Sequence, residues 1–189
     1  MFSTYLQLGF DHILDIQGYD HILFILSITL LYTIFPLRSL IILVTAFTIG
    51  HSITLALSAM SIIEFPSKWI ELLIPITIIL SCLDNLYSAY KSVRIFSRYV
   101  ITLLFGFIHG MGFSSFFRSI IGKEDSIIPP LASFNIGVEL AQLLILLMVV
   151  VILFFLKKLK VKPTYILTLG SMLILLVSVW LFYKQVASF

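Results

Sequence analysis

Long apolar runs separated by short polar connections divide the chain into six segments. The runs cover about residues 17–35, 38–60, 68–90, 98–118, 131–157 and 163–183. A helix of about 20 apolar residues crosses the hydrocarbon core of a bilayer, so each run predicts a transmembrane helix. The runs are continuous and lack the alternation that is typical of a membrane β-barrel. The pattern therefore predicts an all-α fold, a polytopic membrane bundle of about six transmembrane helices.

The N-terminal stretch, residues 1–18, is only moderately apolar and contains Asp11, His12 and Asp15. It is too short and too polar to span, and it predicts a short N-terminal helix that is interfacial or re-entrant. It contains no Lys or Arg, so we expect no cleavable signal peptide. The tetrapeptide Asp-His-Ile-Leu occurs at 11–14 and again at 20–23, which we interpret as a local repetition. The short connections predict a single integral membrane domain over residues 1–189.

Composition supports the same class of protein. The chain is 60% hydrophobic and 11% charged, and its mean hydropathy is +1.14. Soluble domains are usually about 25% charged, so the sequence indicates an integral membrane protein with membrane lipids as its surroundings. The net charge of +3 is small and gives no indication of nucleic acid as a partner.

Basic residues predict the orientation of the bundle. Eight Lys and Arg fall between the first and second, third and fourth, and fifth and sixth runs, against four on the opposite side. The side that is richer in Lys and Arg should be cytoplasmic. We therefore expect both termini and the 119–130 connection to lie outside the cytoplasm, in the inner membrane of a bacterium.

Ionisable side chains lie inside four of the apolar runs. His51 and His109 are each nine positions below the outer end of their predicted helices, a depth of roughly 13 Å. Glu139 is eight positions in, at a depth of roughly 12 Å, and Asp20 and His21 are somewhat shallower. Ionisable groups at membrane depth are costly, and they usually mark function.

Other polar positions gather at the same depth. Asn135, Glu139 and Gln142 occupy positions i, i+4 and i+7, so they share one face of the fifth helix. Thr48 and Ser52 flank His51 and extend a polar stripe along the second helix. This clustering predicts one polar site formed by several helices.

Glycine spacing favours a close helix pair at that site. Gly106 and Gly110 lie four residues apart and flank His109 on the N-terminal and C-terminal sides. Two small residues at this spacing let a neighbouring helix approach closely. We expect the partner helix to bring one of its own polar side chains near His109.

Imidazoles and carboxylates together predict a site for a divalent transition metal, Zn²⁺ or Ni²⁺, between which ligand type does not choose. A lone intramembrane histidine can instead form a hydrogen bond across a helix interface. The predicted metal ligands are Asp20, His21, His51, His109 and Glu139. The residues predicted to support the ligands are His12, Thr48, Ser52, Asn135 and Gln142.

Three further polar residues are expected outside the site. Glu71, near the outer end of the third run, is expected to be interfacial. Asp84 and Asn85 lie towards the cytoplasmic end of that run, where capping or pairing with Lys91 or Arg94 is favoured. A role for Asp84 and Asn85 in receiving an ion on the inner side stays open.

Four motifs resemble those of the HupE/UreJ family of small membrane proteins. They are His12–Leu14 followed by Gly18–Phe24, then Phe47–Leu55, Phe105–Phe113 and Asn135–Gln142, in that order along most of the chain. The family looks like polytopic proteins associated with nickel supply to hydrogenase and urease, some of them treated as nickel or cobalt permeases. The resemblance implies that the family's polar core is formed here by Asp20, His21, His51, His109 and Glu139.

Three functions fit these patterns. The first is a divalent-metal permease or metal-delivery protein, which would need a homo-oligomer or a partner subunit because six helices leave little room for a gated path. The second is a metal-dependent hydrolase of a lipid or lipid-linked substrate, with Glu139 or Asp20 as general base and Ser52 polarising a carbonyl. The third is an accessory membrane subunit without chemistry of its own.

Overall fold

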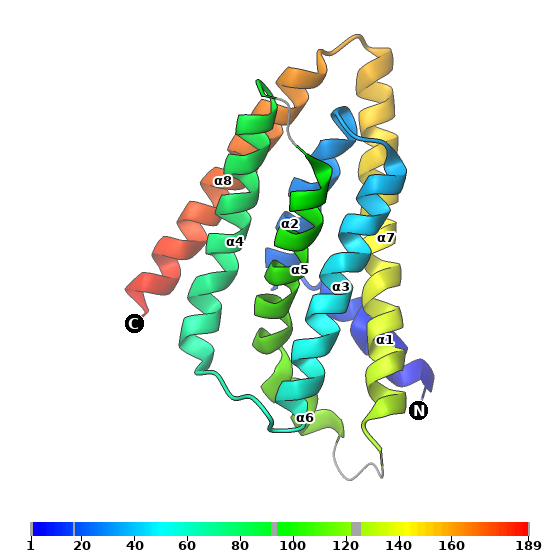
Figure 1. Cartoon of the computed structure of the whole chain (residues 1–189), viewed down its shortest axis with the longest axis vertical. Helices are drawn as coiled ribbons and strands as arrows, with labels where there is room; N and C mark the ends of the chain where they lie inside the picture. The colour runs from blue at the N-terminus through cyan, green and yellow to red at the C-terminus, as the bar shows by residue number, and fades with distance from the viewer. Residues whose placement is uncertain (1, 17, 92–93, 122–125, 189) are drawn as a thin grey trace.

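The computed structural model describes residues 2–16, 18–91, 94–121 and 126–188, and the elements in this part of the chain are helices (Figure 1). The all-α prediction is therefore confirmed. The elements are α1 (Phe2–Leu14), α2 (Asp20–Thr29), η1 (Leu30–Thr33), α3 (Leu37–Ala59), α4 (Ser67–Ser88), α5 (Ile95–Gly112), α6 (Ser114–Ile121), α7 (Ile128–Lys158) and α8 (Pro163–Ala187).

Within the described ranges, five helices are long and apolar enough to cross a membrane: α3, α4, α5, α7 and α8. The first predicted run differs from the other five. Its helix begins at Asp20 and consists of ten α-helical residues followed by four 3₁₀ residues, which gives a length of roughly 23 Å. The bundle thus has five full-length spans, with a shorter apolar helix in place of the sixth.

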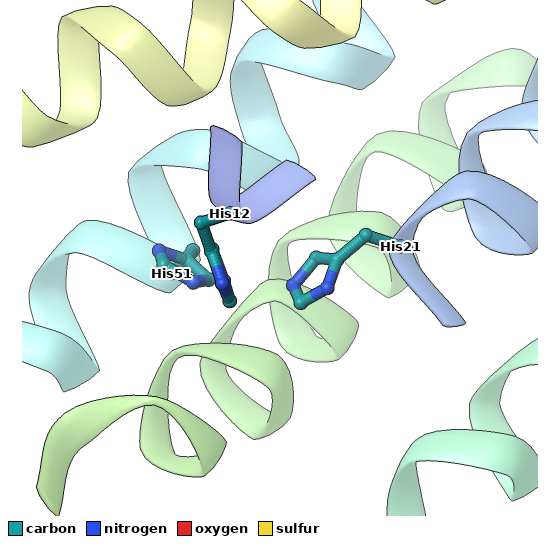
Figure 2. A group of neighbouring side chains, drawn as sticks. All are labelled: His12, His21 and His51. Atoms are coloured by element: carbon teal, nitrogen blue, oxygen red, sulfur yellow. The ribbon is translucent and has the colours of Figure 1, made fainter. Parts of the chain in front are cut away.

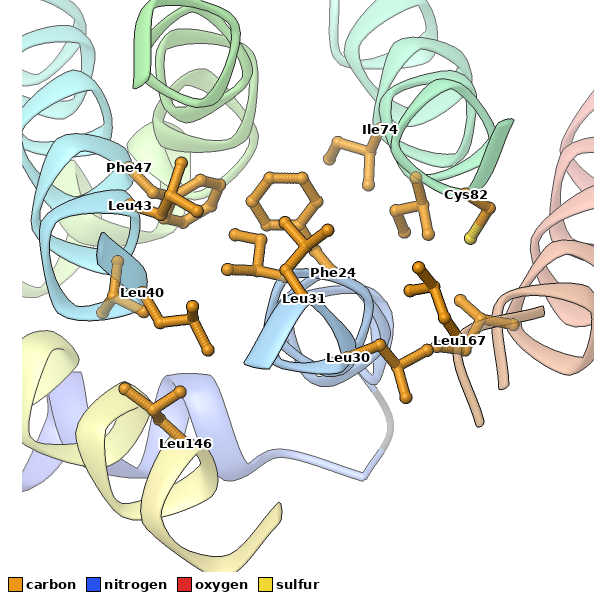
Figure 3. Close-up of a cluster of buried hydrophobic side chains, with 14 of the residues drawn as sticks. Phe24, Leu30, Leu31, Leu40, Leu43, Phe47, Ile74, Cys82, Leu146 and Leu167 are labelled. Carbon is orange, nitrogen blue, oxygen red and sulfur yellow. The ribbon is translucent and has the colours of Figure 1, made fainter. Parts of the chain in front are cut away.

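The short helix is accommodated because it lies in the middle of the bundle. Figure 3 shows α2 and η1 surrounded by α3, α4, α7 and α8. Phe24 and Leu31 are almost fully buried there, among the apolar side chains of the neighbouring helices. Neighbouring helices, rather than lipid alone, therefore pack against the side chains of this short segment.

Helices α3 and α5 pack backbone against backbone through glycine. A Cβ on Gly106 would lie 2.3 Å from the Phe47 carbonyl oxygen, and one on Gly110 would lie 2.2 Å from the His51 carbonyl oxygen. Such distances are far below van der Waals contact, so only glycine allows this approach. The predicted close pair is present, and it holds His51 and His109 on adjacent helix faces.

The N-terminal helix α1 packs on α7 by the same device. A Cβ on Gly9 would lie 2.0 Å from the Phe134 carbonyl oxygen, and one on Gly137 would lie 2.0 Å from the Leu6 carbonyl oxygen. The chain then turns after Leu14, and α2 begins at Asp20. This turn lets residues of α1 and α2 face the same interior space.

The two ends of the bundle differ in composition. The η1–α3, α4–α5 and α7–α8 connections, which carry the basic residues, lie towards one end, and both termini point towards the other (Figure 1). Lys123, which belongs to the predicted outer set, lies outside the described residues.

The polar groups near the C-terminal end of α4 pair differently from the expectation. Asp84 forms an ion pair with Arg98 of α5, with a distance of 2.6 Å between Oδ2 and Nη2, and Arg98 also donates to the Asn85 side-chain oxygen at 3.1 Å. The favoured partners, Lys91 and Arg94, were therefore wrong for this contact. Arg98 lies inside α5 and can reach both side chains, whereas Lys91 follows the end of α4.

Candidate metal centre

Three histidines from three helices meet inside the bundle. His12 of α1, His21 of α2 and His51 of α3 each offer one ring nitrogen, and these nitrogens lie within 4.8 Å of one another (Figure 2). The ring centroids of His12 and His21 are 4.6 Å apart, and each lies 5.9 Å from the centroid of His51. Residues separated by up to 39 positions thus form one cluster.

A fourth imidazole adjoins this cluster from α5. The ring centroid of His109 lies 5.2 Å from that of His21. The Nδ1 of His109 lies 2.9 Å from the Phe105 carbonyl oxygen. A carbonyl only accepts, so Nδ1 must carry the proton and Nε2 keeps its lone pair in the neutral ring.

Asp20 fixes His21 in the same tautomer. Its Oδ1 accepts from the backbone N–H of His21 at 2.8 Å and lies 3.1 Å from Nδ1 of the ring. The carboxylate therefore favours a proton on Nδ1 and leaves the Nε2 lone pair available. Many metal-binding histidines are oriented and made more basic by a carboxylate in this way. In this geometry Asp20, predicted as a metal ligand, is placed to orient the ring of His21.

The nitrogens that face the cluster lack other partners. In the part of the chain that the structure describes, Nε2 of all four histidines is buried and makes no hydrogen bond. A buried polar group without a partner is costly, and four such groups in one place indicate a ligand. Tetrahedral Zn²⁺ with bonds of 2.0–2.1 Å holds its nitrogens about 3.4 Å apart, so small side-chain rotations would close the cluster on an ion.

The environment also keeps His12 neutral. Burial lowers the pKa of His12 well below its usual value, and the nearby His21 and His51 lower it further. Only the neutral ring can bind a metal, so this shift favours the state that is competent to bind.

Glu139 lies in a separate polar cluster between α3 and α7. The hydroxyl of Thr45 donates to one carboxylate oxygen at 2.7 Å, and Thr48 forms a short hydrogen bond with the other. Thr48 also lies 2.9 Å from Oε1 of Gln142. Both oxygens of Glu139 thus have hydroxyl partners, and the group of possible ligands around His51 does not include it.

The other predicted supporting residues are divided between the two clusters. Asn135 lies beside His51, and it donates to the Leu131 carbonyl oxygen at 2.9 Å. The hydroxyl of Ser52 donates a hydrogen bond to the Thr48 carbonyl oxygen at 2.6 Å, within the same helix. Asn135 is therefore placed to orient an imidazole, whereas the hydroxyl of Ser52 is used within α3.

The structure adds to what the sequence suggested for two residues. His12, predicted as a supporting residue, is one of the three clustered histidines, and the repeated Asp-His-Ile-Leu was the signal that could have found it. Glu71, predicted to be interfacial, lines a cavity of about 270 Å³ together with His12, His21 and His109. No pattern along the sequence indicated that position for Glu71.

An aromatic layer, formed by Phe24 and Phe47, lies beside the cluster. The rings of Phe24 and Phe47 are 4.8 Å apart, and their centroids lie 5.4 Å and 5.0 Å from that of His109. Both side chains are about 1% exposed. These rings therefore pack directly against the imidazole of His109.

The fold and the cluster define a class: an integral membrane protein built of helices, with buried histidines converging from four of them. The model of the HupE/UreJ protein family matches residues 1–185, so the chain belongs to this family. The family is associated with nickel or cobalt transport or with urease maturation. No curated protein and no solved structure shows a significant match to the chain.

Proposed function

We propose that the protein is a divalent-metal permease of the nickel/cobalt type, which binds its ion at the histidines in the outer half of the membrane. The observation that carries the proposal is the convergence of four buried imidazoles whose Nε2 atoms have no partner among the described residues. Neutral imidazole suits Ni²⁺, Co²⁺ and Zn²⁺ alike. Family membership favours nickel or cobalt as the cargo.

One face of α2 supports a route for the ion. His21, Phe24 and Ser27 occupy positions i, i+3 and i+6, and the Ser27 hydroxyl lies 2.8 Å from that of Ser81 on α4. A second cavity, of about 370 Å³, is lined by Ser81, by the ion-paired Asp84 and Arg98, and by apolar residues of α2–α5 and η1. Oxygen ligands thus follow the imidazoles in order along this face.

The aromatic layer makes the route a gated one. Phe24 and Phe47 must separate before an ion can move from the imidazoles to Ser27 and Ser81. The proposal includes assembly with a second copy or a partner subunit, since a bundle of this size leaves little room for such a movement. It also treats residues 1–189 as one integral membrane domain.

The hydrolase alternative receives less support. A general base must come within hydrogen-bond reach of the reacting proton. Glu139 is bonded to Thr45 and Thr48, Asp20 is bonded to His21, and the hydroxyl of Ser52 is donated to its own helix. The three residues expected to act in hydrolysis therefore do not surround one reacting atom.

Ni²⁺ uptake by proteoliposomes tests the permease proposal. We expect the wild-type protein to admit Ni²⁺ to an enclosed metal indicator, and His21→Ala to lower the initial rate by at least about tenfold, as loss of a metal-site residue typically does. Thr168→Ala, which changes a hydroxyl on α8 outside the histidine cluster, is the matched control and should retain the rate. Equal uptake by wild type and His21→Ala would refute the proposal.

The orientation is tested separately. We propose that both termini lie outside the cytoplasm, because eight Lys and Arg lie in the predicted inner connections or in the adjoining ends of the helices, against four towards the other side. A phosphatase that is active only outside the cytoplasm, fused after Phe189, should therefore be active. A cytoplasmic reporter that is active at this position would reverse the orientation.

A further inference from the structure

Two cavities adjoin at the outer entrance to the histidine cluster. The cavity of about 270 Å³ is lined by three of the imidazoles and by Asp15, Asp20 and Glu71. A smaller cavity of about 170 Å³ shares Asp20 and Glu71 with it and extends to Gln185 on α8. Asp20 and Glu71 therefore stand at the boundary between the two spaces.

The buried imidazoles indicate what kind of ligand these carboxylates would bind. His21 and His109 are 4% and 1% exposed, and their Nε2 atoms, which line the same cavity, have no hydrogen-bond partner in the described ranges. Three carboxylates alone would form an ordinary solvated patch. Here the carboxylates adjoin the buried Nε2 atoms of His21 and His109, whose lone pairs need a cation or a proton donor.

Glu71 is the outermost of these groups and is held in place. Its side chain is exposed, it comes from the second turn of α4, and Gln185 of α8 donates a short hydrogen bond to its Oε2. This bond uses one oxygen and orients the other. Asp20 is half-buried and closer to the imidazoles, since its Oδ1 is bonded to His21.

We propose that Glu71, with Asp15 and Asp20, forms a capture site that holds a hydrated divalent cation before it reaches the histidines. The proposal rests on the permease function above and adds the step that loads its site. Water bound to a divalent ion donates hydrogen bonds to carboxylates, so the ion can be held while it keeps its hydration shell. Six waters at about 30 Å³ each need about 180 Å³, which the larger cavity provides.

The capture site acts on the rate of binding more than on final affinity. Negative charge that lines a low-dielectric cleft raises the local concentration of a cation and its association rate by about 10–10³-fold. Once imidazoles have replaced the waters, the ion no longer depends on Glu71. Neutralising Glu71 should therefore slow association and leave dissociation nearly unchanged.

Stopped-flow binding of Ni²⁺ to the purified full chain in detergent tests the proposal, with a fluorescent metal indicator as the readout. At low ionic strength, Glu71→Gln should lower the association rate constant by about tenfold, whereas Glu71→Asp, which keeps the charge, should lose much less. Glu64→Gln is the matched control. Glu64 is an exposed acid that forms an ion pair with Arg118 at 3.1 Å, and it lines neither cavity, so its neutralisation should change the rate less than twofold.

A second measurement needs no variant. Raising the salt from 0.01 M to 1 M shortens the Debye length from about 30 Å to about 3 Å, so the wild-type association rate should fall steeply. A rate independent of salt, or equal rates for Glu71→Gln and Glu64→Gln, would overturn the capture site while leaving the permease proposal in place. Wild-type protein that binds no Ni²⁺ at all would overturn both.

Discussion

Ni²⁺ at a hundredfold excess over its dissociation constant should stabilise the protein by about 2.7 kcal/mol, because a ligand that binds only the folded state adds its binding free energy to folding. His12, His21 and His51 come from three different helices, so one ion bound by all three ties those helices together. Thermal unfolding in detergent, with and without Ni²⁺, measures the effect.

Histidine variants show whether the imidazoles share one ion. His21→Ala and His51→Ala should each abolish most of the stabilisation, and the double substitution should add little, since both act on the same site. Thr168→Ala should keep the full effect. Separate and additive losses from the two histidines would mean that they act independently, as two hydrogen-bonding side chains would.

The same stabilisation should depend on pH. Protons compete for the lone pairs, so the effect of Ni²⁺ should be complete at neutral pH. Because burial lowers the pKa of His12 well below the usual value of about 6.5, the effect should fade only at a pH below that value. Burial lowers the pKa of His12 in the folded protein, so the unfolded chain takes up a proton more readily there. Stability without metal should therefore also fall as the pH drops below about 6.5.

Gly110→Ala is expected to lower the free energy of unfolding substantially. Its Cβ would lie 2.2 Å from the His51 carbonyl oxygen and 2.3 Å from the Thr54 hydroxyl, so α3 and α5 would have to separate. Overpacking of this kind costs about 1–3 kcal/mol, and more where the backbone resists. The separation would also move His109 away from His51, so the stabilisation by Ni²⁺ should fall in the same variant.

Gly112→Ala is the matched control on the same helix. Its Cβ would meet the Cδ1 of Ile74 at 3.2 Å, the end of a flexible side chain that can give way. Alanine is also a better helix former than glycine by about 1 kcal/mol, so the net change should be small. Unfolding by heat, compared for both variants, checks the pair. Equal stability of Gly110→Ala and Gly112→Ala would contradict the backbone contact between α3 and α5.

The apolar runs alone determined that the chain forms membrane helices, because a span needs about 20 consecutive apolar residues and no other element satisfies its backbone in lipid. They also predicted similar depths for His51 and His109 from position along each helix, but α5 ends at Gly112 and not at the predicted residue 118. The close pair of α3 and α5 followed from Gly106 and Gly110. These properties depend on neighbouring residues in the sequence, so the order of residues is enough to predict them.

The tertiary structure decided which polar groups share a site. The turn between Leu14 and Asp20 brings His12 to His21, whereas the hydroxyls of Thr45 and Thr48 hold Glu139 in a separate cluster. Packing of α4 against α8 places Glu71 beside the cavity that His21 and His109 also line. The tertiary structure also allows the first apolar run to form a short helix, because α3, α4, α7 and α8 surround α2 and η1. Each outcome depends on which faces of different helices pack together. Residue spacing within one helix does not determine that packing.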